Sequence, residues 1–273
     1  MTKTRKNRSP RIIVYYMKSN NLGDGFNPLI FNHFISNKRP QYRNVYDTAA
    51  NNASSSIIGI GSILSLNNKI DTSNHVIVGS GFIDKKLVPQ RPRSIISVRG
   101  PKTRRKFIDA GIPCPRIYGD LGLLLRYIVP PPMICNKKYT FGFIPHNYDK
   151  YSPFILKAME YPGWKVIDIN QADNVKNFVK EIHECKYILS SSLHGIIIAD
   201  SYGIPAYHTM LSNKLEGGLW KFKDYYASIH RKYSNVDITS MDEKTILKQM
   251  TPYHIDFDFD GYYRYIKDEL SKL

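Results

Sequence analysis

The feature that most constrains the fold of this chain is a repeated order of short apolar segment, polar loop and helix. The apolar runs at 12–17, 75–78 and 94–98 are long enough for a buried strand and too short for a helix. Each is followed by a loop that carries glycine or other turn-forming residues. Strands that alternate with helices build parallel sheets whose two faces are both covered. The sequence therefore predicts an α/β fold.

The same order runs through both halves of the chain. In the first half, prolines stand at the start of two expected helices, where the missing amide hydrogen costs nothing. The expected strands there are 12–17, 56–60, 75–78 and 94–98, and the expected helices begin at Pro28 and cover 102–110. In the second half we expect strands at 139–144, 164–169 and 187–189, and helices at 153–159, at 174–184, after Ser192 and at 262–273.

The length of the chain favours two domains. At 273 residues it exceeds the usual size of a single domain. The run Pro130-Pro131-Pro132 is typical of a stiff linker. We therefore expect two Rossmann-like lobes, at 1–130 with a basic N-terminal tail and at 131–253. The helix within 254–273 is expected to pack back on the first lobe.

The net charge of +16 indicates attraction to phosphates, acidic polymers or an anionic membrane surface. No zinc finger or RNP motif accompanies this charge, which makes nucleic acid an unlikely partner. The basic residues gather at two places, the N-terminal tail and the segment 85–105. They are Lys3, Arg5, Lys6, Arg8 and Arg11 in the tail, followed by Lys85, Lys86, Arg91, Arg93, Arg99, Lys102, Arg104 and Arg105.

Neither a membrane span nor a disulfide framework is expected. The longest apolar runs fall short of the roughly 18 residues that a spanning helix needs. The basic start lacks the long apolar stretch and small-residue cleavage site of a signal peptide, so we expect a cytoplasmic protein whose charge permits peripheral contact with the inner face of the membrane. Cys114, Cys135 and Cys185 are odd in number and widely spaced, which favours reduced thiols over disulfides or a CxxC site.

One junction has the chemistry of an anion site. The segment 187–189 reads as a buried strand, and the helix after it begins close to Ser190, Ser191, Ser192 and His194. Unpaired amide groups and the helix dipole favour a phosphate or carboxylate at a helix N-terminus. The structural alternative is that one serine caps the helix while His194 packs against a neighbour.

Several other loops that carry polar or glycine residues also follow expected strands. In two-lobed α/β proteins, ligands bind outside the carboxyl ends of the strands, so these loops should share one interlobe cleft. The GxG at 79–81 lacks the third glycine and acidic partner of a dinucleotide site and does not establish one. The loops lie at 20–27, 59–62, 79–82, 99–102, 145–146 and 190–194.

These segments, taken together, resemble the motifs of the polysaccharide pyruvyl transferase family, and the resemblance covers most of the chain. They fall in the family's order. The matching segments are Asn21-Leu22-Gly23-Asp24 with Asn27-Pro28, Gly59 to Leu64, Ser97 to Thr103, Tyr118 to Leu124, Phe143 to His146, and Ser192-Leu193-His194-Gly195. The segment Lys221 to Tyr226 is similar to one in members that modify bacterial exopolysaccharides.

The resemblance implies a glycosyltransferase B type of fold and a pyruvyl transferase activity. The donor substrate would be phosphoenolpyruvate, with no other cofactor and no metal. The acceptor would be two hydroxyls of a polysaccharide or lipid-linked sugar, giving a pyruvate ketal and phosphate. The first lobe would be the acceptor side and the second the donor side. The acceptor sugar, its hydroxyl pair and the oligomeric state stay open.

The resemblance also assigns roles to residues. His194 is expected to donate the proton, Arg99 to clamp the anionic donor, and Asp24 to orient or deprotonate an acceptor hydroxyl. The donor-binding set is Ser190, Ser191, Ser192, Leu193, Gly195, His146 and Lys102. The acceptor-binding set is Asn21, Gly23, Asn27, Gly61, Ser62 and Gly81.

Structural alternatives accompany these roles. Asp24 is suited to cap the next helix, and Arg99 to pair with an acidic neighbour. His146 fits an ordinary loop residue. For Asp120 and the segment 221–226 a structural role, as a loop cap and a packed helix edge, is favoured over catalysis.

Ser192 is a departure from the resemblance, because many family members carry an arginine there. Either the serine and the helix N-terminus suffice, or another basic residue such as Lys102 substitutes, or activity is lost. Two other functions stay open: a glycosyltransferase that uses a nucleotide sugar, and a non-catalytic basic binding module.

Overall fold

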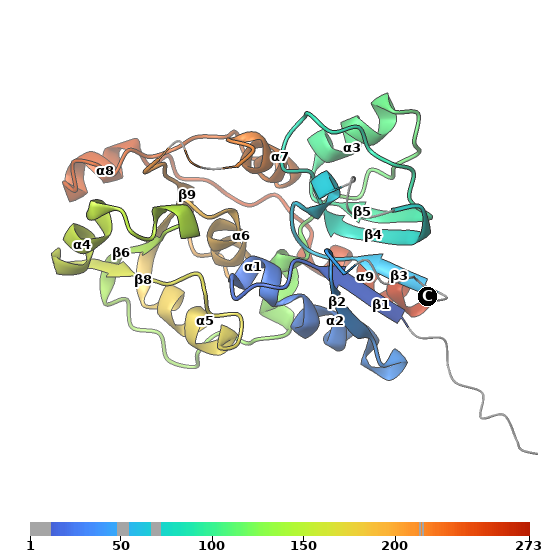
Figure 1. The fold of residues 1–273 in the computed structure, drawn as a ribbon. Helices are drawn as coiled ribbons and strands as arrows, with labels where there is room; N and C mark the ends of the chain where they lie inside the picture. Colours follow the sequence, from blue (N-terminus) through green and yellow to red (C-terminus); the bar gives the residue numbers. More distant parts are fainter. Residues whose placement is uncertain (1–11, 48–54, 67–71, 213, 215) are drawn as a thin grey trace, which may run out of the picture.

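The computed structural model of this chain contains two parallel β-sheets that lie side by side, each flanked by helices (Figure 1). It describes residues 12–47, 55–66, 72–212, 214 and 216–273. The five basic residues expected in the N-terminal tail lie outside these ranges. The α/β class expected from the sequence is confirmed, and the two sheets correspond to two Rossmann-like lobes.

The first sheet has five parallel strands in the order β2-β1-β3-β4-β5. Its strands β1 and β4 are buried along their whole length, as expected for a sheet covered on both faces. Strand β1 pairs with β2 on one side and β3 on the other, with Val14 opposite Tyr42 and Ile57. The strands are β1 (Ile12–Tyr16), β2 (Gln41–Asn44), β3 (Ser55–Ile58), β4 (His75–Ser80) and β5 (Ser94–Val98).

Helices cover both faces of this sheet. Helix α2 (Asn27–Ile35), α9 (Phe259–Ser271) and the 3-10 helix η4 (Leu121–Tyr127) contribute apolar residues to the core on one face. Helix α3 (Pro101–Asp109) closes the other face, where Phe107 packs with residues of β3, β4 and β5. The short helix α1 (Leu22–Gly25) precedes α2 at the end of the loop that follows β1.

The second sheet has four parallel strands in the order β7-β6-β8-β9. One face packs on α5 (Val175–His183) and α6 (Leu193–Ser201), and the other on α4 (Pro153–Glu160) and α8 (Glu243–Gln249). The strands are β6 (Tyr139–Ile144), β7 (Trp164–Val166), β8 (Cys185–Ser190) and β9 (Ala206–His208).

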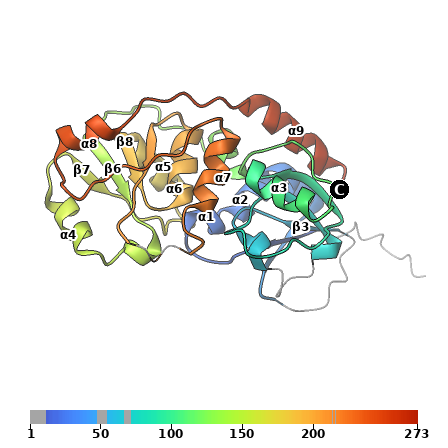
Figure 2. The same cartoon turned by 90° about the horizontal axis from the view of Figure 1, so that it is seen from above.

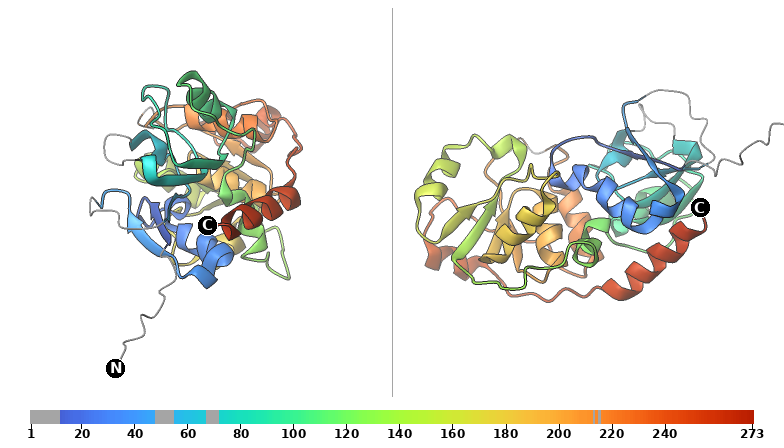
Figure 3. Two further views of the ribbon diagram at one scale, coloured as in Figure 1. Left: turned by 90° about the vertical axis from the view of Figure 1, so that its right-hand side faces the viewer. Right: turned by 90° about the horizontal axis from the view of Figure 1, so that it is seen from below.

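A single apolar core joins the two lobes. Buried residues of β1 and α2 belong to the same cluster as buried residues of α5 and α6, and η4 packs along α6 between the sheets. After α8 the chain returns along the length of the molecule, so that α9 lies against α2 and η4 of the first lobe (Figures 2 and 3). The second lobe is therefore held to the first both by its own helix α6 and by the C-terminal helix.

Several elements differ from the sequence expectation. Strands β2 and β9 and helix α8 were not expected, whereas α7 (Trp220–Ser228) includes the segment 221–226 that was expected as a packed helix edge. Strand β7 ends at Val166 although the apolar pattern continues to Ile169. Ile167 and Ile169 are nevertheless buried, which explains the continued pattern. Within the described ranges there is no helix with the length and apolarity to cross a bilayer. The three cysteines are free thiols.

Candidate active site

A cavity of about 330 Å³ lies between the lobes, at the carboxyl ends of β1, β3, β4, β6 and β8. Cavities of this size are typical of small-molecule sites. It is lined by seven of the residues expected from the sequence: Asn21, Asp24, Ser62, His146, Ser192, Leu193 and His194. The loops that follow the strands of both sheets therefore do meet at one place.

The serines before α6 divide into two roles. Ser190 is fully buried, and its hydroxyl donates to the carbonyl oxygens of Ile144 and Ser192 while it accepts from the Ser192 amide. The Ser191 hydroxyl accepts a hydrogen bond from the His146 amide at 2.8 Å. These two serines shape the turn, and Ser192, which makes no capping bond to α6, lines the cavity.

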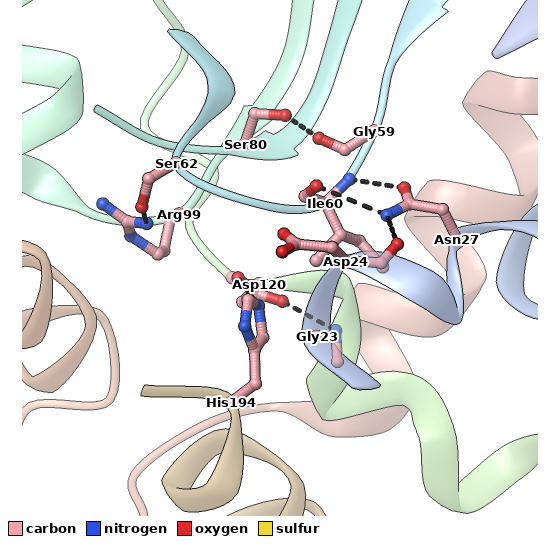
Figure 4. Close-up of polar contacts among 12 residues, drawn as sticks. Gly23, Asp24, Asn27, Gly59, Ile60, Ser62, Ser80, Arg99, Asp120 and His194 are labelled. Carbon is pink, nitrogen blue, oxygen red and sulfur yellow. Dashed lines mark hydrogen bonds and ion pairs between the residues drawn. The ribbon is translucent and has the colours of Figure 1, made fainter. Parts of the chain in front are cut away.

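The side chain of His194 lies beside Asp120 and Gly23 of the first lobe (Figure 4). Its side chain is 12% exposed, and its Nε2 atom lies 3.7 Å from Oδ2 of the fully buried Asp120. Neither of these two atoms has a hydrogen-bond partner among the described residues, and the other Asp120 oxygen accepts from the Gly122 amide. The buried carboxyl group of Asp120 therefore faces the imidazole ring of His194. The sequence had favoured a structural role for Asp120.

Gly23 provides the space for the His194 ring. A Cβ atom at position 23 would lie 1.8 Å from His194 Nδ1 and 2.1 Å from Cγ. The Asn21 side chain accepts from the Gly23 amide at 3.0 Å, which fixes the start of α1. Gly23 thus acts on the site through His194, whereas Asn21 also lines the cavity.

The loop that carries Asp120 is supported by the C-terminal helix. Tyr262 of α9 donates a hydrogen bond to the Gly119 carbonyl at 2.6 Å, and its hydroxyl lies 3.1 Å from Ser97 Oγ. Gly119 has φ +149°, and a Cβ there would lie 2.8 Å from the Tyr262 ring. Helix α9 therefore contributes to the position of the carboxylate behind His194.

Asp24 enters the cavity from α1. Burial raises the pKa of its carboxyl group above the ordinary value, although the charges of His194 and Lys221 act in the opposite direction. Ser19 donates a weak hydrogen bond to Asp24 at 3.4 Å. A carboxylate with a raised pKa is suited to accept a proton from a substrate hydroxyl.

Asn27 and Gly61 support the wall next to Asp24. The Asn27 side chain is fully buried, accepts from the Ile60 amide at 2.7 Å and donates to the Asp24 carbonyl at 2.7 Å. Gly61 has φ +124°, and a Cβ there would lie 3.2 Å from Asp24 Oδ1. Both residues therefore hold the loop after β3 beside α1, and neither lines the cavity.

Arg99 lies behind the cavity wall. Its guanidinium is 0% exposed and forms an ion pair with Asp224 of α7, with Nε 3.3 Å from Oδ2. It also donates to the Ser62 hydroxyl at 2.7 Å and to the Phe82 carbonyl. Gly81 makes room for it, since a Cβ at position 81 would lie 2.4 Å from Arg99 Cζ. Arg99 does not line the cavity, which gives no support to the expectation that it clamps the donor directly. Its contacts match the structural alternative, in which it pairs with an acidic neighbour.

Two other expected donor contacts lie away from the cavity. Lys102 has an exposed side chain on α3, and its backbone amide donates to Asp224 at 2.9 Å. Gly195 is buried within α6, where a Cβ would lie 2.4 Å from Ser190 Oγ. Neither Lys102 nor Gly195 lines the cavity.

His146 lines the cavity from the loop after β6. Burial, followed by the charge of Lys221, lowers the pKa of its imidazole to about 4. Its Nδ1 accepts from the Tyr148 amide at 3.3 Å, so the proton of the neutral ring is on Nε2. His146 is therefore a neutral hydrogen-bond donor near pH 7.

Lys221 is the main residue of the cavity that sequence reasoning placed elsewhere. It lies in the first turn of α7, is 9% exposed and lines the cavity near Asp24 and Glu216. Burial, and next the charge of Arg99, lower its pKa to about 8, while Asp24 and Glu216 act in the opposite direction. The resemblance of 221–226 to a family segment was the only signal for it. The described residues contain no group of three or more His, Cys, Asp or Glu side chains placed to hold a metal ion.

A sequence model of the polysaccharide pyruvyl transferase family matches residues 6–213 of this chain. The chain belongs to the polysaccharide pyruvyl transferase family. The match includes all of the cavity residues up to His194 and ends before Lys221. Pyruvyl transferases are group-transfer enzymes.

The chain is also similar to individual proteins. The chain is 32% identical over 218 residues to an uncharacterized protein of Acanthamoeba polyphaga mimivirus, covering 78% of this chain and 72% of that one. It is 24% identical over 215 residues to the succinoglycan biosynthesis protein ExoV of Rhizobium meliloti, covering 76% of this chain and 62% of ExoV. A crystal structure of a functionally uncharacterized Klebsiella pneumoniae protein gives a TM-score of 0.44 at 16% identity, covering 83% of this chain and 93% of that one.

Proposed function

We propose that this chain transfers the enolpyruvyl carbon skeleton of phosphoenolpyruvate onto two hydroxyls of a sugar, forming a cyclic pyruvate ketal. The observation that carries the proposal is the position of His194, which lies in the first turn of α6 in a cavity shared by both lobes, in a chain of this family. Amide groups at a helix N-terminus favour the phosphate or carboxylate of such a donor.

The reaction balances with the groups in the cavity. A proton adds to the methylene carbon of the donor, which becomes the methyl group of the ketal. The two sugar oxygens bond to the central carbon, and the bond from that carbon to the phosphate oxygen breaks. The hydroxyls release two protons: one replaces the proton given to the methylene carbon, and the other leaves with phosphate.

His194 and Asp24 suit the two proton transfers. His194 would protonate the methylene carbon, and the carboxylate of Asp120 behind it would stabilise the charged imidazole before it gives up the proton. Asp24, with its raised pKa, would accept a proton from an attacking hydroxyl. His146 would donate a hydrogen bond to donor or acceptor from its neutral ring.

We further propose that the lobes have the glycosyltransferase B arrangement, with the acceptor on the first lobe and the donor on the second. The acceptor is proposed to be a polysaccharide or a lipid-linked sugar, as the name of ExoV refers to biosynthesis of the polysaccharide succinoglycan. We also propose a cytoplasmic site of action, and the net charge of +16 favours peripheral contact with an anionic membrane.

Calorimetric titration tests the donor without knowledge of the acceptor. Phosphoenolpyruvate should bind the full chain saturably, and a uridine diphosphate sugar should not. His194→Ala should weaken this binding while thermal unfolding stays within a few degrees of wild type. Binding of the nucleotide sugar alone would instead support a glycosyltransferase. Binding of neither, with retention on anionic vesicles, would support a basic binding module.

A further inference from the structure

The cavity has an uneven distribution of charge for a site that takes an anionic donor. Phosphoenolpyruvate carries a phosphate and a carboxylate. Three carboxylate side chains face the cavity, from Asp24, Asp84 and Glu216. Lys221 is the sole lysine or arginine among the described residues that line it. An anion in this cavity therefore has one lysine or arginine side chain of the described residues beside it.

The ammonium group of Lys221 lies 5.8 Å from the centre of the Phe222 ring and forms no ion pair with a described residue. Among the described residues, no carboxylate oxygen lies within 4.0 Å of its ammonium group and no hydrogen bond is formed by it. It is nevertheless only 9% exposed. Burial of most of the side chain disfavours its charge, and an anion that binds beside the ammonium group offsets this cost.

The rest of α7 is built to hold Lys221 in this place. Asp224, one turn later, is fully buried and accepts hydrogen bonds from the Lys102 amide, the Thr103 amide and the Thr103 hydroxyl at 2.7–3.0 Å. It thereby caps α3 from a distant part of the chain and pairs with Arg99. The fit is close, because a Cβ on Gly100 would lie 2.1 Å from the Asp224 carbonyl oxygen.

The ion pair between Arg99 and Asp224 also contacts a residue of the cavity wall in the first lobe. Arg99, paired with Asp224, donates to Ser62, which lines the cavity. One buried ion pair thus fixes both a wall residue of the first lobe and the helix that carries Lys221. Arg99 acts through Asp224 and Ser62, and its own guanidinium stays out of the cavity.

We propose that Lys221 is the side-chain cation that binds the anionic group of the donor, and that Arg99 and Asp224 are positioning residues that hold it there. This inference rests on the proposed function for the identity of the donor. It does not rest on it for the anion site, which inorganic phosphate also probes. The family match ends at residue 213 and does not include Lys221.

Lys221→Met tests the proposal, with Lys223→Met as the matched control. Lys223 lies on the same helix with an exposed side chain, so the control removes the same charge outside the cavity. Phosphoenolpyruvate and inorganic phosphate are each titrated into wild type and both variants by calorimetry. A charge-assisted contact corresponds to about 10- to 100-fold in affinity. We expect that loss in Lys221→Met and less than about a twofold change in Lys223→Met.

The pH dependence of binding separates a direct contact from a structural effect. The charged or titratable groups around Lys221 are Asp24, Glu216, Arg99, His146 and His208. The pKa of Lys221 is about 8, so its charge is lost above that pH. Wild-type affinity should therefore fall above about pH 8. In Lys221→Arg it should not, because arginine stays protonated.

Each outcome decides between the two claims. Loss of both ligands in Lys221→Met alone supports both. If wild type binds phosphate through Lys221 and does not bind phosphoenolpyruvate, the anion site stands and the proposed donor is wrong. If wild type binds phosphoenolpyruvate and Lys221→Met binds it within about threefold of wild type, the role of Lys221 is wrong and the proposed function stands. If wild type binds neither, both are wrong.

Discussion

Gly23→Ala should destabilise the protein through His194, although the substitution lies in a helix where alanine is favoured. The new Cβ would lie 1.8 Å from His194 Nδ1, and non-bonded atoms are at their optimum about 3.5–4.0 Å apart. Helix α1 and the ring must therefore separate by more than about 1 Å. Overpacking of this kind costs about 1–3 kcal/mol, and the helix preference of alanine returns up to about 1 kcal/mol. We expect a net loss of about 1–2 kcal/mol.

A double-mutant cycle isolates this contact. In the His194→Ala background the ring is absent, so Gly23→Ala should be neutral or stabilising by up to about 1 kcal/mol. Denaturant unfolding of the four proteins gives the coupling free energy, which should be about 1–3 kcal/mol. Phosphoenolpyruvate turnover in Gly23→Ala should also fall about 100-fold, the usual result of displacing a catalytic group by 1 Å. Equal destabilisation in both backgrounds would refute the reasoning.

Three other substitutions test the surrounding network. Asp224→Ala leaves the buried Arg99 charge without its partner and should cost about 3–5 kcal/mol in denaturant unfolding, whereas a change below about 1 kcal/mol would contradict the anchoring role. Asp120→Asn should reduce turnover about 100-fold with donor affinity within about threefold of wild type, and unchanged turnover would remove Asp120 from the account. Burial raises the pKa of Asp200 to about 6 from 3.8, so the folded state holds this proton more tightly and wild-type stability should fall by about 2 kcal/mol between pH 4 and 7 relative to Asp200→Asn. A parallel pH dependence of the two proteins would contradict this.

The elements that could be predicted from the sequence are those whose pattern is local. The strands at 94–98 and 139–144 match the structure residue for residue, because buried parallel strands are continuous apolar runs. Strand β2 has the sequence Gln-Tyr-Arg-Asn and lies at the edge of its sheet, where polar residues are tolerated, so no apolar run marks it.

Helix α7 shows more clearly what a local sequence pattern does not predict. Its buried residues include Lys221, Asp224, Tyr225 and Tyr226, and such a set has no simple apolar stripe. It is stabilised by the ion pair between Asp224 and Arg99, which are 125 residues apart. No local pattern reports a contact of that separation.

The candidate site also has a part that the sequence predicts and a part that it does not. The loops that meet in the cavity could be predicted, because parallel strands place their carboxyl ends at one edge. Which cation faces the cavity could not, because Arg99 and Lys221 are distinguished only by where Asp224 lies. The sequence likewise predicts only a structural loop role for Asp120, and its contact with His194 is visible only in the fold.

The most direct test of the account is transfer itself. Phosphoenolpyruvate labelled in its carbon skeleton is incubated with the full chain and a panel of free and lipid-linked oligosaccharides. The account predicts an acid-labile, labelled glycan, formed together with an equal amount of phosphate and absent with His194→Ala. Transfer of a sugar from a nucleotide donor in the same mixture, with phosphoenolpyruvate unconsumed, would contradict it.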